Sequence, residues 1–141
     1  MIQNKLETVE ISVNATRQQC WQAWGTPEDI AVWNAPNNDW QTTKVENDLV
    51  TGGKFLFRME AKDGSEAFDH DGIYDKVILE ELIEYTVSDG RKSVIAFKQD
   101  AENTIVSESF EPAPNPSLEI QKQFVLGVLQ RFKNHVESKY N

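Results

Sequence analysis

The sequence predicts an α+β protein, with a curved antiparallel β-sheet of about six to seven strands around a long C-terminal α-helix and two short helices after the first strand. Residues 116–140 carry apolar side chains every three or four positions, which is the spacing of one helix face. Residues 40–110 instead alternate between apolar and polar in short segments separated by turn residues, which is typical of hairpin-linked strands. The sheet must bend around the final helix to bury its apolar face.

The C-terminal helix should run from Pro116 to Tyr140, with Asn115 as its N-cap. Its apolar face comprises Ile120, Phe124, Val125, Val128, Leu129, Phe132, Val136 and Tyr140. Gly127 lies within this face, although glycine in a helix interior costs roughly 1 kcal/mol relative to alanine. The missing side chain predicts free space that either a closely packed strand or a ligand would occupy.

The N-terminal part predicts one strand and two helices. Residues 9–13 alternate between apolar and polar, as in a strand with one solvated face. A helix should follow, capped by Asn14 and ended by Gly25. The Thr-Pro dipeptide after that glycine is typical of a second helix start, and this short helix should end near Trp33.

Period-two alternation predicts the remaining strands. They cover residues 40–45, 54–59, 68–74, 82–87, 93–98 and 104–110. The concave face should carry Phe55, Phe57, Met59, Phe68, His70, Gly72 and Tyr74. A register error of one residue would place His70 in solvent instead.

Size and charge restrict the possible functions. A chain of 141 residues is expected to form a single domain over residues 1–141. Its net charge of −9 repels phosphate backbones and anionic lipids, so we expect no nucleic-acid or membrane partner. Acidic residues are concentrated between Met59 and Gly90, where they predict a solvated sheet face or, alternatively, a docking surface for a basic partner. The lack of a signal-peptide core indicates a cytoplasmic protein.

The sequence contains no motif for a metal or cofactor. Its single cysteine, Cys20, is expected to be a buried packing residue and excludes an internal disulfide. Zinc spacing, a glycine-rich phosphate loop, a nucleophile elbow and a plausible catalytic triad are all absent. His135 lies late in the final helix, where it suits the negative end of the helix dipole. We therefore expect no cofactor and no metal.

Several short motifs occur in a recognisable order along nearly the whole chain. They are WQAWGTPEDIAVW at 21–33, GGKFLFRM at 52–59, Asp63-Gly64-Ser65, Gly72-Ile73-Tyr74, Ile83-Glu84-Tyr85, Asp89-Gly90-Arg91 and Phe110-Glu111. This ordered set resembles the START-like superfamily, also called SRPBCC or helix-grip. Within that superfamily it is most similar to the branch named after the C-terminal domain of the activator of heat-shock protein 90 ATPase.

The resemblance implies a curved sheet that grips the C-terminal helix and encloses a cavity. Relatives in the superfamily use this cavity for lipids, sterols, polyketides or hydrophobic hormones, and some are cyclases or hydrolases. Eukaryotic-type activators carry a separate N-terminal domain that grips the chaperone, and 141 residues leave no room for it. This departure weakens the expectation of a chaperone partner.

The leading hypothesis is a protein that binds a small apolar molecule between the sheet and the final helix. The expected ligand-binding residues are Trp33, Phe55, Phe57, Phe68, His70, Tyr74, Phe124, Gly127, Val128 and Phe132. One alternative is a partner that stimulates a chaperone ATPase through the acidic strands. Another is a cavity enzyme of cyclase or hydrolase type that uses His70 as its acid or base. His70 could equally be a histidine hydrogen-bonded within the core or at its rim.

Overall fold

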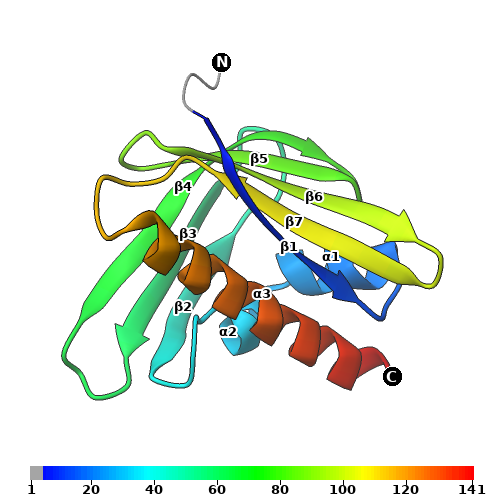
Figure 1. The fold of residues 1–141 in the computed structure, drawn as a ribbon, viewed down its shortest axis with the longest axis horizontal. Coiled ribbons are helices and arrows are strands. Elements are labelled where there is room, and N and C mark those ends of the chain that lie inside the picture. Colours follow the sequence, from blue (N-terminus) through cyan, green and yellow to red (C-terminus); the bar gives the residue numbers. More distant parts are fainter. Residues whose placement is uncertain (1–4) are drawn as a thin grey trace.

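A computed structural model describes residues 5–141 and contains seven strands and three helices (Figure 1). The elements in chain order are β1 (Glu7–Val13), α1 (Arg17–Gly25), α2 (Pro27–Trp33), β2 (Trp40–Asn47), β3 (Lys54–Ala61), β4 (Ala67–Ile78), β5 (Leu82–Val87), β6 (Lys92–Asp100), β7 (Asn103–Phe110) and α3 (Leu118–Tyr140). The predicted α+β class and element order are confirmed.

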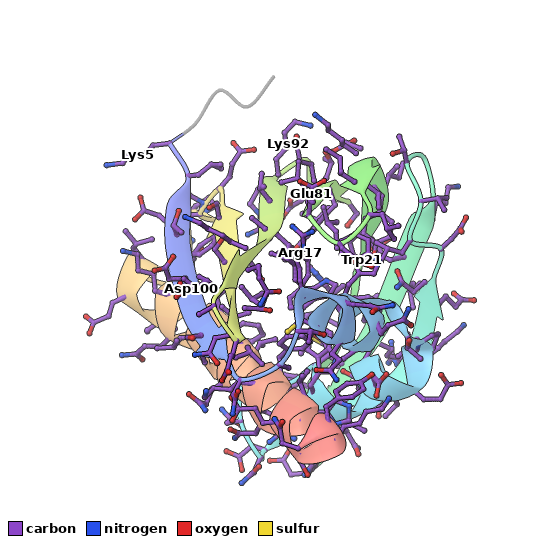
Figure 2. All side chains as sticks on the ribbon, turned by 90° about the vertical axis from the view of Figure 1, so that its right-hand side faces the viewer. Lys5, Arg17, Trp21, Glu81, Lys92 and Asp100 are labelled. Carbon is purple, nitrogen blue, oxygen red and sulfur yellow. The ribbon has the colours of Figure 1, made fainter. Side chains whose placement is uncertain are left out.

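The seven strands form one antiparallel sheet that curls into a half-barrel around α3. The spatial order is β1-β7-β6-β5-β4-β3-β2, so the first strand pairs with the last one and every other pair is a hairpin neighbour. Figure 2, viewed toward the C-terminal end of α3, shows the strands in an arc around α3 and α1. α1 and α2 both contact α3, α1 also contacts β6 and β7, and α2 also contacts β2. The helices thus fill the concave side of the sheet.

The strand register places the predicted aromatic residues on the concave face. Phe55 pairs with Gly72 and Phe57 with His70 across β3 and β4, so these side chains point to the same side. Phe55 and Phe57 are buried, and β4 has an irregularity just after Tyr74. His70 therefore faces inward, as the alternation predicted.

Two predicted helix caps are wrong. The N-cap of α1 is Thr16 rather than Asn14, because Thr16 and Gln19 form a reciprocal capping box in which the Gln19 amide donates to Thr16 Oγ1 over 3.1 Å. The N-cap of α3 is Ser117 rather than Asn115, and the helix begins at Leu118. The Gln121 side chain holds the segment between β7 and α3. It accepts a hydrogen bond from the Ala113 amide and donates one to the Ala113 carbonyl.

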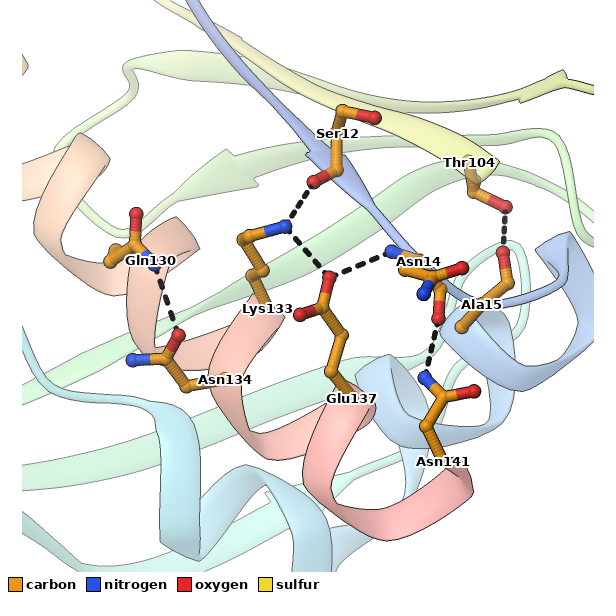
Figure 3. A network of polar contacts seen from close by, with 9 residues as sticks. All are labelled: Ser12, Asn14, Ala15, Thr104, Gln130, Lys133, Asn134, Glu137 and Asn141. Atoms are coloured by element: carbon orange, nitrogen blue, oxygen red, sulfur yellow. Dashed lines mark hydrogen bonds and ion pairs between the residues drawn. The ribbon is translucent and has the colours of Figure 1, made fainter. Parts of the chain in front are cut away.

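Polar contacts hold the C-terminal half of α3 against the end of β1 (Figure 3). Lys133 Nζ donates to the Ser12 carbonyl over 2.8 Å and pairs with Glu137 over 2.7 Å. The Asn14 amide donates to Glu137 Oε2 over 2.8 Å, and Asn141 Nδ2 donates to the Asn14 carbonyl over 2.7 Å. The backbone of Asn14 therefore contacts the end of α3 instead of capping α1.

Gly127 leaves no open space for a strand or a ligand, in contrast to the prediction. Its α-carbon faces the Pro36 carbonyl in the loop between α2 and β2, and an added Cβ would overlap the Pro36 oxygen. The glycine is needed because a backbone segment, neither a strand nor a ligand, crosses α3 at this point.

The remaining core agrees with the expectation for Cys20. Its side chain is fully buried, and burial raises the pKa of the thiol to about 11. Trp21, labelled in Figure 2, packs edge-on against Phe97 with ring centres 5.3 Å apart. No helix within residues 5–141 is long and apolar enough to cross a membrane.

Candidate functional site

A cavity of about 120 Å³ lies between the concave face of β3–β5, the end of α2 and the N-terminal half of α3. It is lined by Trp24, Trp33, Asn34, Phe55, Phe57, Met59, Phe68, His70, Tyr74, Ile83, Tyr85, Glu108, Phe124, Val125 and Val128. A more open groove of about 360 Å³ continues from it toward the segment before α3. The two spaces share Phe68, His70, Tyr85, Glu108, Phe124 and Val125. Together they form one largely apolar recess with a broad opening.

Eight of the ten predicted site residues line this cavity. They are Trp33, Phe55, Phe57, Phe68, His70, Tyr74, Phe124 and Val128. Phe132 does not line it, because its fully buried ring packs edge-on against Trp24 and Trp33, with centres 5.0 and 5.2 Å away. Gly127 lies outside it as well, against Pro36. Phe132 thus supports the cavity wall from behind.

Phe55 is the centre of the aromatic wall. Its ring centre lies 5.0 Å from Tyr74, 5.1 Å from Tyr85, 5.3 Å from Phe57 and 5.4 Å from His70. Such edge and tilted contacts stabilise aromatic clusters by about 0.5–1.5 kcal/mol per pair beyond area burial. These contacts hold the rings of Tyr74, Tyr85 and His70 in fixed positions around Phe55.

Tyr74 contributes a ring to the wall but no free hydroxyl. Its hydroxyl donates to the Asn47 side-chain oxygen on β2. Burial raises the pKa of Tyr74, which keeps the phenol protonated. Tyr85, by contrast, lines both the cavity and the groove, and burial raises the pKa of its phenol.

His70 is inside the recess but is not hydrogen-bonded to any residue within 5–141. Burial, followed by the positive charge of Arg91, lowers the pKa of His70 to about 4, although Asp71 and Asp89 oppose this shift. At neutral pH the imidazole is uncharged and is a poor proton donor to a reacting group. The alternative of a histidine hydrogen-bonded within the core finds no partner for His70 among residues 5–141, and a hydrogen bond at the rim stays a prediction.

Glu108 is a charged residue of the recess that the sequence reasoning missed. It lies on β7 opposite Ile95 of β6 and Val9 of β1, and Ile95 is fully buried on the concave face. Burial raises the pKa of the Glu108 carboxyl to about 7. No side chain within residues 5–141 forms a hydrogen bond or an ion pair with this carboxyl group. The signal was present, because Glu108 alternates in phase with the buried Val106 and Phe110.

The family described as "Activator of Hsp90 ATPase homolog 1-like protein" matches residues 14–127, which is most of the chain. The chain belongs to this family. Its fold agrees with the START-like superfamily to which the sequence motifs pointed.

Solved structures support the same assignment. The AHSA1-like protein from Aeromonas hydrophila is 33% identical, with 94% of each chain covered and a TM-score of 0.85. A protein from Cytophaga hutchinsonii is 39% identical, with 97% of this chain and 94% of that chain covered and a TM-score of 0.82. A protein from Chromobacterium violaceum shares the fold, with a TM-score of 0.81 and 20% identity. The match covers 93% of this chain and 98% of that chain. A comparison with curated proteins gives no match.

The recess of this AHSA1-like protein has a defined chemical character. Aromatic and aliphatic side chains form most of its surface, while His70, Tyr85 and Glu108 supply polar atoms at its junction with the groove. Such a site can hold a mainly apolar molecule by one polar group. Proton transfer near neutral pH would depend on Glu108 rather than His70. Within residues 5–141, no three acidic, histidine or cysteine side chains gather as metal ligands.

Proposed function

We propose that this AHSA1-like protein binds a small, mainly apolar molecule in the recess between its sheet and α3. The observation that carries the proposal is the apolar cavity of about 120 Å³ that opens into the groove of about 360 Å³. Burial of apolar surface supplies roughly 25 cal/mol per Å², so a ligand with an aromatic or aliphatic body gains most of its binding free energy here.

The N-terminal half of α3 is the exposed wall in this proposal. Phe124 and Ile120 line the groove and remain 38% and 54% exposed, whereas Leu129 and Phe132 farther along α3 are fully buried. The exposed apolar side chains lose contact with water when a ligand fills the groove. The polar contacts at the C-terminal half keep the helix in place during this process.

The test uses the neutral fluorescent probe N-phenyl-1-naphthylamine. Val125 is half-buried and lines both the cavity and the groove, so Val125→Trp should occupy the recess and weaken probe binding at least tenfold. Leu126→Trp is the matched control, because Leu126 is the next residue, is 46% exposed and does not line the recess. Equal probe affinity in the two variants, or no saturable binding to the wild type, would overturn the proposal.

A second candidate function rests on the family match itself. The family is described by its likeness to an activator of Hsp90 ATPase, and the chain has a net charge of −9 that suits a basic partner surface. In this role, added protein raises the ATP turnover of the cognate chaperone, and salt weakens the effect. Unchanged turnover at micromolar protein would exclude it.

A further inference from the structure

The polar end of the recess differs from an ordinary apolar pocket in its charge. Glu108 is a half-buried residue that lines both the cavity and the groove, and its carboxyl group has no hydrogen-bond donor or counterion among residues 5–141. Burying an unpaired carboxylate is costly, and native proteins normally pair or neutralise it. A ligand that enters the recess can therefore provide the partner that this carboxyl group lacks.

The surrounding groups favour a positive partner over a negative one. Arg91 lines the groove, but its Nε atom is paired with Asp89 over 2.8 Å. Glu111 also lines the groove, where its carboxylate accepts a hydrogen bond from the Lys92 amide over 2.9 Å. His70 is uncharged at neutral pH. The recess consequently presents more negative than positive charge to a ligand.

The aromatic wall adds to this preference. Phe68, His70 and Tyr85 line the same junction as Glu108, and Phe55 and Phe57 stand directly behind it in the cavity. The faces of phenyl and phenol rings attract cations, with an interaction of about 0.5–2 kcal/mol that increases with desolvation. A carboxylate among aromatic rings is a combination that recognises ammonium groups.

We propose that the ligand is a small organic amine, whose apolar body lies in the cavity and whose ammonium group pairs with Glu108. This inference rests on the proposed ligand site and names the class of molecule that occupies it. The ammonium group donates hydrogen bonds to the carboxylate, and the neighbouring Tyr85 and neutral His70 provide further polar contacts.

The test compares three probes with the same body, namely 4-phenylbutylamine, 4-phenylbutan-1-ol and 4-phenylbutyrate, by calorimetric titration at pH 8. The amine should bind the wild type at least tenfold more tightly than the alcohol, and the carboxylate most weakly. Glu108→Gln should abolish the preference for the amine. Glu102→Gln, in the exposed turn between β6 and β7, is the matched control and should retain it.

A second measurement on the wild type covers the case in which Glu108→Gln does not fold. Because the pKa of Glu108 is about 7, its ionised fraction increases about tenfold from pH 6 to pH 8, and affinity for the amine should increase with it. His70, Tyr85, Arg91 and Glu111 face the same recess; His70 titrates below this range and Tyr85 above it. Affinity for the alcohol should stay constant.

The outcomes separate the two proposals. If the alcohol binds as tightly as the amine, or if the amine preference survives in Glu108→Gln, the assignment of an amine is overturned and the apolar site stands. If neither the three probes nor N-phenyl-1-naphthylamine binds saturably, both are overturned. A selective, Glu108-dependent affinity for the amine supports both.

Discussion

The α-carbon of Gly127 in α3 packs directly against the backbone carbonyl of Pro36, in the loop that joins α2 to β2. This contact lets the helix and the loop approach more closely than any side chain would allow. The loop leads from Trp33, which lines the cavity, to β2. The glycine therefore sets the spacing between α3 and one wall of the recess.

Gly127→Ala should destabilise the protein even though alanine is the better helix former. The gain of about 1 kcal/mol in helix propensity is smaller than the cost of displacing the Pro36 backbone, so we expect a net loss of about 1–3 kcal/mol in the free energy of unfolding. Urea denaturation measures this change.

Gly25→Ala is the matched control for Gly127→Ala. An added Cβ at Gly25 meets only the end of the Leu49 side chain, at 2.8 Å, and a flexible side chain can move away. This variant should lose less stability than Gly127→Ala. Unchanged or increased stability of Gly127→Ala would show that the Pro36 loop moves without cost.

Asp29 joins α2 to the end of α3, and removing its charge should weaken this connection. Its buried carboxylate lies 2.7 Å from His135 Nε2 and 2.9 Å from Lys139 Nζ. Asp29→Asn should lower the free energy of unfolding by about 1–3 kcal/mol, because charge-assisted hydrogen bonds to a buried group are lost. Glu46→Gln, which breaks only an exposed pair with Lys44, should change it by less than about 0.5 kcal/mol. Equal effects of the two variants would contradict the prediction.

The sequence predicted the aromatic wall well because strand alternation depends on a simple period of two. Phe55, Phe57 and His70 all lie on the expected face. The space at Gly127 was misassigned because an absent side chain indicates close approach but does not identify the approaching group. Local sequence around the glycine contains no information about a loop that lies about ninety residues earlier.

Glu108 was missed for a different physical reason. Acidic residues are almost never fully buried without a partner, so an acid in an acidic chain is reasonably assigned to solvent. Glu108 alternates in phase with Val106 and Phe110, which predicts that its side chain points inward. One alternating position is weaker evidence than the general tendency of acidic residues to be exposed. Long-range pairing of β7 with both β1 and β6 is what decides that the carboxyl group points inward.

Glu108 should make the protein less stable as the pH rises. Its pKa is about 7 in the folded state against an ordinary value near 4.5, so between these values the folded protein holds a proton that the unfolded chain has released. The penalty is absent below about pH 4.5 and complete above about pH 7. Relative to Glu108→Gln, the wild type should therefore lose about 2–3 kcal/mol between pH 5 and pH 8. A constant difference across this range in urea denaturation would show that the carboxyl group titrates normally.

His70 should have the opposite effect and destabilise the protein in acid. Its pKa is about 4 in the folded state and about 6.5 when exposed, so from pH 6.5 down to pH 4 the unfolded chain binds a proton that the folded protein does not. Between pH 7.5 and pH 5 the wild type should lose about 2 kcal/mol relative to His70→Gln.

Proton NMR tests the cause directly, because the chain has two histidines and the signal missing in His70→Gln identifies its ring. That signal should keep its neutral position down to about pH 5. A midpoint near pH 6.5 would mean that water reaches the imidazole freely, and the recess would then be too wet to favour an apolar ligand.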